Sequence, residues 1–269
     1  MKTTIYYFSA TGNSLHIAKM IAGKLGECKL ISIPSLRHDR SIVADTEQVG
    51  FVFPMHYFGL PPIVRQFFEK VDMKQVTYSF AVVTSGSSRH LSSTLQQADT
   101  LLEQQGKKLD AGLHVGMISS YIPLSDLPPA EKMQQKLAKA DEKVQEIVNA
   151  VLAKQRIRET EPLWMPFAVI NHYWRKNLLT QAHRKFSCKP SCTSCSVCEQ
   201  VCPVGNIRLV DGKPQWANDC QECLACLHFC PVQSIEFGGR TAGRKRYHHP
   251  KVAVGDIIQS RKAAPESRD

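Results

Sequence analysis

Eight of the ten cysteines in this 269-residue chain fall into two copies of one pattern, C-x2-C-x2-C-x3-C-P. The first copy consists of Cys192, Cys195, Cys198 and Cys202, followed by Pro203. The second consists of Cys220, Cys223, Cys226 and Cys230, followed by Pro231. The offset between the two copies is the same at all four cysteines, so the unit is an internal repeat.

This spacing is typical of cube-shaped iron–sulfur clusters. Three thiolates on a short loop reach three corners of one cube, while the fourth, on the following helical turn, points away and ligates the other cluster. A proline after the last ligand suits a sharp stop in the chain. We therefore predict two [4Fe–4S] clusters with crossed ligation. One set would be Cys192, Cys195, Cys198 and Cys230, and the other Cys202, Cys220, Cys223 and Cys226.

Zinc is the alternative metal, because paired C-x2-C motifs also bind zinc. Zinc requires neither the third cysteine, nor the C-P step, nor eight thiolates, so we favour iron–sulfur. Two cysteines lie outside the motifs. Cys28 is expected to be a buried small apolar residue. Cys188 is expected to be a bystander, with an alternative-ligand or redox role as the other interpretation.

A second candidate site follows the first predicted strand, where the loop SATGNS at residues 9–14 leads into a helix. The N-terminus of a helix offers unpaired N–H groups and a positive dipole end, which suit a phosphate. The loop matches neither G-x-G-x-x-G nor the ATP-binding G-x4-G-K-[ST], and it lacks Lys and Arg. It indicates a mononucleotide site, with a plain helix N-cap as the alternative. Side-chain donors are expected from Ser9, Thr11, Asn13 and Ser14.

Two further loops are expected beside it. Residues 54–62 and 84–88 follow the third and fourth predicted strands, and ligands of such sheets bind at the carboxyl ends of the strands. Tyr57 or Phe58 could stack on an isoalloxazine ring; the alternative is that both only plug the edge of the sheet. The second loop adds the candidates Thr84, Ser85 and Gly86.

The elements that must position these residues alternate between strand and helix patterns. Strands are predicted at 4–8, 30–33, 49–53, 80–83 and 113–118, and helices at 15–25, 63–71, 90–105 and 131–154. This order predicts a doubly wound α/β domain with a parallel sheet over residues 1–155. We expect a linker at 156–186, a small α+β cysteine-rich domain at 187–238 and a basic C-terminal tail at 239–269.

Composition bounds the remaining possibilities. Hydrophobic residues make up 43% and charged residues 22%, which excludes disorder and a coiled-coil rod. No apolar run reaches the roughly 18 residues needed to cross a bilayer, and the first residues do not resemble a signal peptide. We therefore expect a cytoplasmic location, where thiols stay reduced and cysteines more often bind metal than form disulfides.

The charge is uneven, since residues 151–269 carry 18 Lys and Arg against 10 Asp and Glu. Two oxidised clusters with their thiolates would each carry a charge of about −2, so part of the basic excess would neutralise this negative charge locally. No helix-turn-helix, zinc-finger or RNA-recognition signature is present, and we do not expect nucleic acid as a partner.

Four segments together resemble a known family: YYFSATGNS, VGFVFPMHYFGLPP, AVVTSGSS and the two cysteine motifs. Their order is similar to that of flavodoxin–ferredoxin fusion proteins of anaerobic prokaryotes, as is RYHHP at 246–250. The resemblance implies a flavodoxin-like domain with a five-stranded parallel sheet and FMN, followed by a bacterial-type ferredoxin domain with two [4Fe–4S] clusters. By similarity, the FMN phosphate would be held by Ser9, Thr11, Gly12, Asn13 and Ser14.

The predicted function is electron transfer to a redox partner protein, and no residue is assigned as catalytic. Two alternatives stay open. One is an FMN-dependent reductase of a small acceptor, because Ser85 stands where an aromatic residue commonly covers the flavin. The other is a ferredoxin whose flavodoxin-like domain has lost flavin and only docks partners. The basic tail would favour acidic partners. For residues 164–186 we prefer a linker that packs its aromatics between the domains over a helix at a membrane surface.

Overall fold

The computed structural model describes residues 2–87, 91–162 and 164–262, so Ser88 and His90, predicted in a loop and at a helix start, lie outside the described residues. Its N-terminal region contains a five-stranded sheet in the order β2-β1-β4-β6-β7, and every neighbouring pair is parallel. The strands are β1 (Thr3–Tyr7), β2 (Cys28–Ser32), β4 (Gln48–Pro54), β6 (Tyr78–Ser85) and β7 (Ala111–Gly116). The predicted α/β fold with five parallel strands is confirmed.

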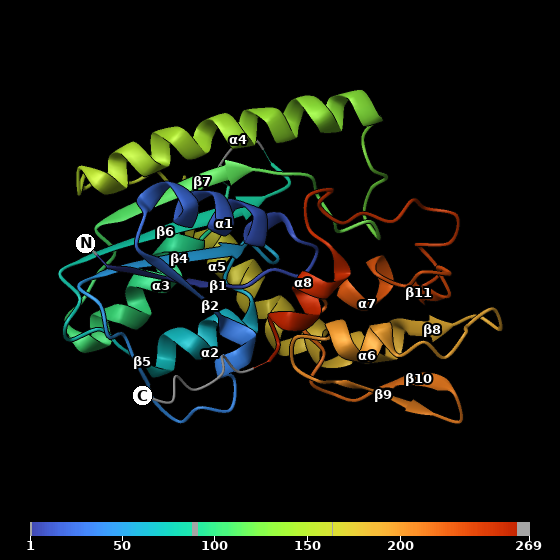
Figure 1. Ribbon diagram of the computed structural model, residues 1–269. Coiled ribbons are helices and arrows are strands. Elements are labelled where there is room, and N and C mark those ends of the chain that lie inside the picture. The colour runs from blue at the N-terminus through green and yellow to red at the C-terminus, as the bar shows by residue number, and fades with distance from the viewer. Residues whose placement is uncertain (1, 88–90, 163, 263–269) are drawn as a thin grey trace.

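Helices cover both faces of this sheet. Helix α1 (Asn13–Leu25) packs with α4 (Ala130–Leu152), and α2 (Pro62–Lys70) packs with α3 (Thr94–Leu102) on the other side (Figure 1). The sheet needs cover on both faces because every residue of β1 and β6 is buried, as expected of a parallel sheet. The smaller elements here are η1 (Ile33–Leu36), β3 (Ile42–Val43), β5 (Val71–Asp72) and η2 (Glu103–Gln105).

The segment predicted as a linker is instead largely helical. It forms α5 (Trp164–Tyr173), the π-helical turn η3 (Trp174–Leu178) and η4 (Leu179–Lys185). Pro166 lies in the first turn of α5, where a missing backbone N–H costs no helical hydrogen bond. None of the described helices combines the length and hydropathy needed to cross a membrane.

The cysteine-rich part consists of two antiparallel strand pairs and two short helices. Strand β8 (Phe186–Cys188) pairs with β11 (Ile235–Phe237), and β9 (Ile207–Val210) pairs with β10 (Lys213–Trp216). The two helices, α6 (Val197–Val201) and α7 (Ala225–His228), begin at equivalent positions of the two copies, as the sequence repeat requires. Figure 1 shows this part beside the carboxyl edge of the sheet, with α8 (Val254–Gln259) lying between the two parts.

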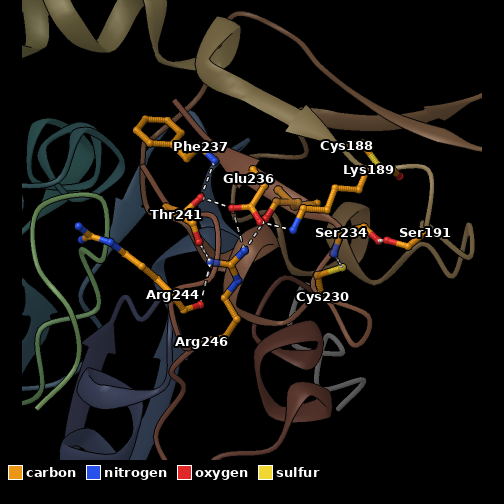
Figure 2. A network of polar contacts seen from close by, with 11 residues as sticks. Cys188, Lys189, Ser191, Cys230, Ser234, Glu236, Phe237, Thr241, Arg244 and Arg246 are labelled. Carbon is orange, nitrogen blue, oxygen red and sulfur yellow. Dashed lines mark hydrogen bonds and ion pairs between the residues drawn. The ribbon is translucent and has the colours of Figure 1, made fainter. Parts of the chain in front are cut away.

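The segment predicted as a basic tail packs against the rest of the protein within the described residues, up to residue 262. Figure 2 shows Arg246 turned inward, with its guanidinium 3.1 Å from Glu236. Glu236 also contacts Lys189 at 2.5 Å and accepts a hydrogen bond from Thr241. The Arg246 side chain is only 6% exposed, so its charge neutralises a buried carboxylate instead of facing a partner.

The apolar core is continuous across both parts of the chain. Phe229, Val252 and Ile257 belong to the same buried cluster as Ile5 of β1 and Phe53 of β4. Burying apolar surface stabilises a protein by roughly 25 cal/mol per Å². Separating the two parts would expose the surface that they share and would therefore destabilise both.

A close approach inside the sheet gives the first prediction. A Cβ added at Gly50 would lie 2.3 Å from Cζ of Phe80, so Gly50→Ala forces this ring or the strand to move. Overpacking of this kind costs about 1–3 kcal/mol, and the thermal midpoint of unfolding should fall by several degrees. The control is Gly23→Ala in α1, where no atom lies within 4 Å and the midpoint should hold or rise. Equal midpoints for both variants would contradict the packing.

Candidate functional site

A large cavity lies at the carboxyl edge of the sheet, with about 1050 Å³ of empty space that is partly open to solvent. Its walls come from the loops after four strands and from residues 222–224 of the cysteine-rich part. Nine of the ten residues predicted to bind a cofactor line it: Ser9, Thr11, Asn13, Ser14, Tyr57, Phe58, Thr84, Ser85 and Gly86.

Gly12, the tenth, supports the loop from outside the cavity. Its φ of 95° favours glycine, and a Cβ there would lie 2.9 Å from Cβ of Val252. Its N–H donates to Oγ of Ser9 at 3.1 Å. The loop is thereby folded tightly at the start of α1, where the first N–H groups have no partner within the helix.

The side chain of Asn13 is hydrogen-bonded to two other parts of the protein. Its amide nitrogen donates to the carbonyl of Ile118 at 2.9 Å, and its oxygen accepts from the Tyr247 hydroxyl at 2.7 Å. The side chain therefore braces the loop against the segment that follows β7 and against the tail. Ser14 and Thr84 are joined by a hydrogen bond of 2.8 Å between their hydroxyl oxygens.

The tail ties this loop to the cysteine-rich part through His228 of α7. Burial lowers the pKa of His228 to about 4, so the ring is neutral at pH 7. Its Nδ1 accepts from the Tyr247 N–H at 3.1 Å, which leaves Nε2 to donate to the carbonyl of Ser120 at 2.7 Å. A further backbone bond joins the His249 N–H to the carbonyl of Thr11 at 2.8 Å. No sequence pattern predicted these hydrogen bonds between the tail, His228 and the loop.

The two aromatics after β4 stack on the segment predicted as a linker. The Tyr57 ring lies parallel to Trp174 with centroids 4.5 Å apart, and Phe58 stacks on Phe167 at 4.7 Å. Both residues have positive φ, 43° and 64°, a backbone conformation that tertiary packing must maintain. They line the cavity and also anchor α5 and η3.

A buried carboxylate joins the cavity to the cysteine-rich part. Glu222 is 4% exposed and accepts from Tyr121 at 2.5 Å and from Tyr57 at 3.0 Å. The indole N–H of Trp174 reaches its other oxygen at 3.3 Å. Burial raises the pKa of Tyr57 to about 12, so this phenol keeps the proton that it donates. No sequence motif indicated that residue 222 would be buried here.

The eight motif cysteines line two shallow hollows, each with about 310 Å³ of empty space when the part that is open to solvent is included. One hollow is lined by Cys192, Cys195, Cys198 and Cys230. The other is lined by Cys202, Cys220, Cys223 and Cys226. These are the sets that crossed ligation would require. Cys195 is exposed, whereas Cys226 is buried, so the first hollow lies nearer the surface.

Both cysteine loops adopt the same unusual backbone. Ser194 and Ser196 have φ of 56° and 61°, and Glu222 and Leu224, at the equivalent positions of the second copy, have 48° and 60°. In proteins generally, an alternation of right- and left-handed residues turns successive N–H groups to one side and forms concavities that bind anions and iron–sulfur centres.

The fourth cysteine of each motif also accepts a backbone hydrogen bond at sulfur. The Asn206 N–H lies 3.2 Å from Sγ of Cys202, and the Ser234 N–H lies 3.2 Å from Sγ of Cys230 (Figure 2). Such bonds stabilise negative charge on sulfur and tune the potential of a cluster. Within the described ranges, no three His, Cys, Asp or Glu side chains gather closely enough to hold a single metal ion.

The two remaining cysteines differ in their surroundings. Cys188 is absent from the lining of both hollows, although burial and a hydrogen bond with Cys192 raise its pKa to about 11. Cys28 was predicted to be buried but is only partly so. It begins β2, an edge strand in which only Ser32 is fully buried.

A family model for the flavodoxin domain matches residues 4–115. The N-terminal region is flavodoxin-like. Its strand order, with the second strand at one edge followed by the first, is that of the flavodoxin fold. A comparison with curated proteins gives no match.

Solved structures similar to this chain include a putative flavoprotein from Bacteroides uniformis, with 21% identity and a TM-score of 0.33 over 42% of this chain and 89% of the other. A putative flavoprotein from Bacteroides eggerthii has 16% identity and a TM-score of 0.36, covering 56% and 98%. An archaeal flavodoxin has 14% identity and a TM-score of 0.32, covering 55% and 99%.

The buried carboxylate gives the second prediction. Glu222→Leu leaves the donors of Tyr57, Tyr121 and Trp174 without this acceptor, at about 1–3 kcal/mol for each one that stays buried and unpaired. The thermal midpoint should fall by at least about 5 °C, and the emission of Trp174 should shift to the red. In the control, Glu103→Gln removes an exposed partner of Lys108 and should leave both unchanged. An unshifted midpoint in Glu222→Leu would contradict the network.

Proposed function

We propose that this chain is an electron-transfer protein that carries low-potential electrons to a redox partner through two [4Fe–4S] clusters and FMN. The observation that carries the proposal is the position of Cys223, which lines both a cysteine hollow and the large cavity at the sheet edge. When bound, the clusters would exchange single electrons and the flavin one or two. Cys223 and its neighbour Leu224 stand in the walls of both sites, which keeps the distance between the sites short.

The cavity fits a flavin mononucleotide. Its phosphate would meet the unpaired N–H groups at the start of α1 together with the hydroxyls of Ser9, Thr11 and Ser14. No Lys or Arg lines the cavity among the described residues, which suits one phosphate held by neutral donors. The flavodoxin-like fold of the region supports this assignment.

The two hollows fit iron–sulfur clusters. Loops with the left-handed residues seen here, together with the N–H bonds to Cys202 and Cys230, would supply positive potential where a cluster and its thiolates concentrate negative charge. A single zinc ion would draw sulfurs to within about 4 Å of each other, given Zn–S bonds of about 2.3 Å. A cube holds its thiolates on alternate corners and further apart, in keeping with cysteines that surround a hollow.

The positions of the two hollows suggest a different role for each. The hollow with exposed Cys195 would face a partner protein, while the hollow with Cys223 would serve the cavity. We further propose that the flavodoxin-like domain comprises residues 1–155 and the ferredoxin domain 187–238, in a reducing, cytoplasmic setting where free thiolates persist.

Reduction of a small acceptor at the flavin is the second candidate. The cavity is partly open to solvent, and Leu124 on its rim is 77% exposed. Ser85 occupies a wall position where a large side chain would close it. Turnover of small acceptors by the reduced protein would favour this reaction over the carrier role.

The third prediction concerns cofactor content of protein purified without oxygen. We expect about eight irons and one FMN per chain, measured by iron assay and by chromatography of the flavin released on denaturation. Eight irons without flavin, even after FMN is added, would leave a ferredoxin with a docking domain. Zinc in place of iron would overturn the proposal.

The fourth prediction tests crossed ligation with two double variants. In Cys195→Ala/Cys202→Ala both clusters lose a ligand, so no intact four-iron cluster should remain. In Cys195→Ala/Cys230→Ala both changes fall on one cluster, so the other should stay intact. Electron paramagnetic resonance of the reduced proteins and iron counts distinguish them. The reverse result would show uncrossed ligation within each motif.

A further inference from the structure

The outer face of α5 is apolar and exposed. Met165, Val169 and Tyr173 follow each other at intervals of four residues and are 61%, 65% and 58% exposed. Trp164 and Ile170 flank them at 41% and 44%. We call these five residues the α5 face. Contiguous apolar surface of this kind marks an interaction site more often than chance exposure does.

The opposite side of the same helix is firmly held. Phe167 stacks on Phe58, and Asn171, which is fully buried, donates to the carbonyl of His56 at 3.0 Å. The next turn is fixed by Trp174, stacked on Tyr57. Because these contacts set the rotation of the helix, the α5 face cannot turn inward without breaking them. The expectation that this segment packs its aromatics inside therefore holds for one side only.

The segment that contains the α5 face carries charges of one sign. Residues 164–185 contain no Asp or Glu but carry Arg175, Lys176, Arg184 and Lys185. The last three are exposed. Glu69 of helix α2 acts electrostatically on Arg175 and is itself paired with Arg65 at 3.0 Å. Exposed apolar side chains on α5 are therefore followed along the chain by exposed basic side chains.

We propose that the α5 face docks the protein on an anionic lipid bilayer, with its apolar side chains in the headgroup boundary and the basic residues on lipid headgroups. Side chains of this kind suit that boundary, because Trp and Tyr have one apolar and one polar end and Lys and Arg reach outward from apolar surface. A helix of ten residues is too short to span and would lie in the plane of the membrane.

The fifth prediction is tested by flotation of the full-length protein with vesicles. One set contains phosphatidylcholine alone, and the other adds phosphatidylglycerol as a minor component. We expect flotation with the anionic vesicles only, and its loss at about 0.5 M salt, where the screening length falls to a few ångströms. Equal binding to neutral vesicles, or none to anionic ones, would overturn the proposal.

Two variant pairs separate the two contributions. Val169→Asp/Tyr173→Asp should abolish flotation, whereas Leu152→Asp, an equally exposed apolar position on α4, should not change it. Lys176→Glu/Arg184→Glu should weaken binding at least about tenfold, since each basic residue near an anionic surface contributes about 1 kcal/mol. Lys132→Glu/Lys139→Glu on α4 is the charge-matched control.

A different occupant of the α5 face would give a different result. If it joins two copies of the chain, light scattering would show a dimer without vesicles that Val169→Asp/Tyr173→Asp dissociates. If it binds a soluble redox protein, the same variant would impair electron delivery while anionic vesicles float neither protein. Either outcome would overturn docking on a membrane, and neither depends on whether the cavity holds FMN.

Discussion

The seating of one buried carboxylate determines how the two halves of this protein meet. Glu222 lies between two motif cysteines, yet its partners Tyr57, Tyr121 and Trp174 come from three other segments. A carboxylate removed from water is costly unless donors surround it, so the cysteine loop has one favourable position on the sheet edge. The cavity and the adjacent hollow are consequently shaped together, and Cys223 belongs to both.

The two cysteine loops contain strained backbone conformations. Four non-glycine residues, beginning with Ser194, adopt positive φ in two matching pairs, each at an appreciable conformational cost. In each copy a backbone N–H, that of Asn206 or Ser234, donates to the sulfur of the fourth cysteine. Because both repeats retain this geometry, it answers a requirement shared by both hollows rather than the packing of one loop.

The tail makes the phosphate loop dependent on the cysteine-rich part. Val252 lies close to Gly12, and the Tyr247 hydroxyl donates a hydrogen bond to the Asn13 side chain. The ring of His228 joins the tail to the segment after β7 through two hydrogen bonds. A neutral imidazole is required for this connection, since Nδ1 accepts while Nε2 donates. Residues beyond 245 therefore help to hold the loop at the start of α1 in its conformation.

The sequence by itself determined the parallel sheet and the two cysteine motifs, because hydrophobic period and motif spacing act over a few residues and need no distant partner. Tertiary structure decided what depends on contacts far apart in the chain. It turned the Asn13 amide toward Tyr247, left Cys28 half-exposed on an edge strand and divided α5 into a packed side and an exposed side. Glu222 and Tyr57, which are hydrogen-bonded, are 165 residues apart in the sequence, a separation over which no local pattern carries information.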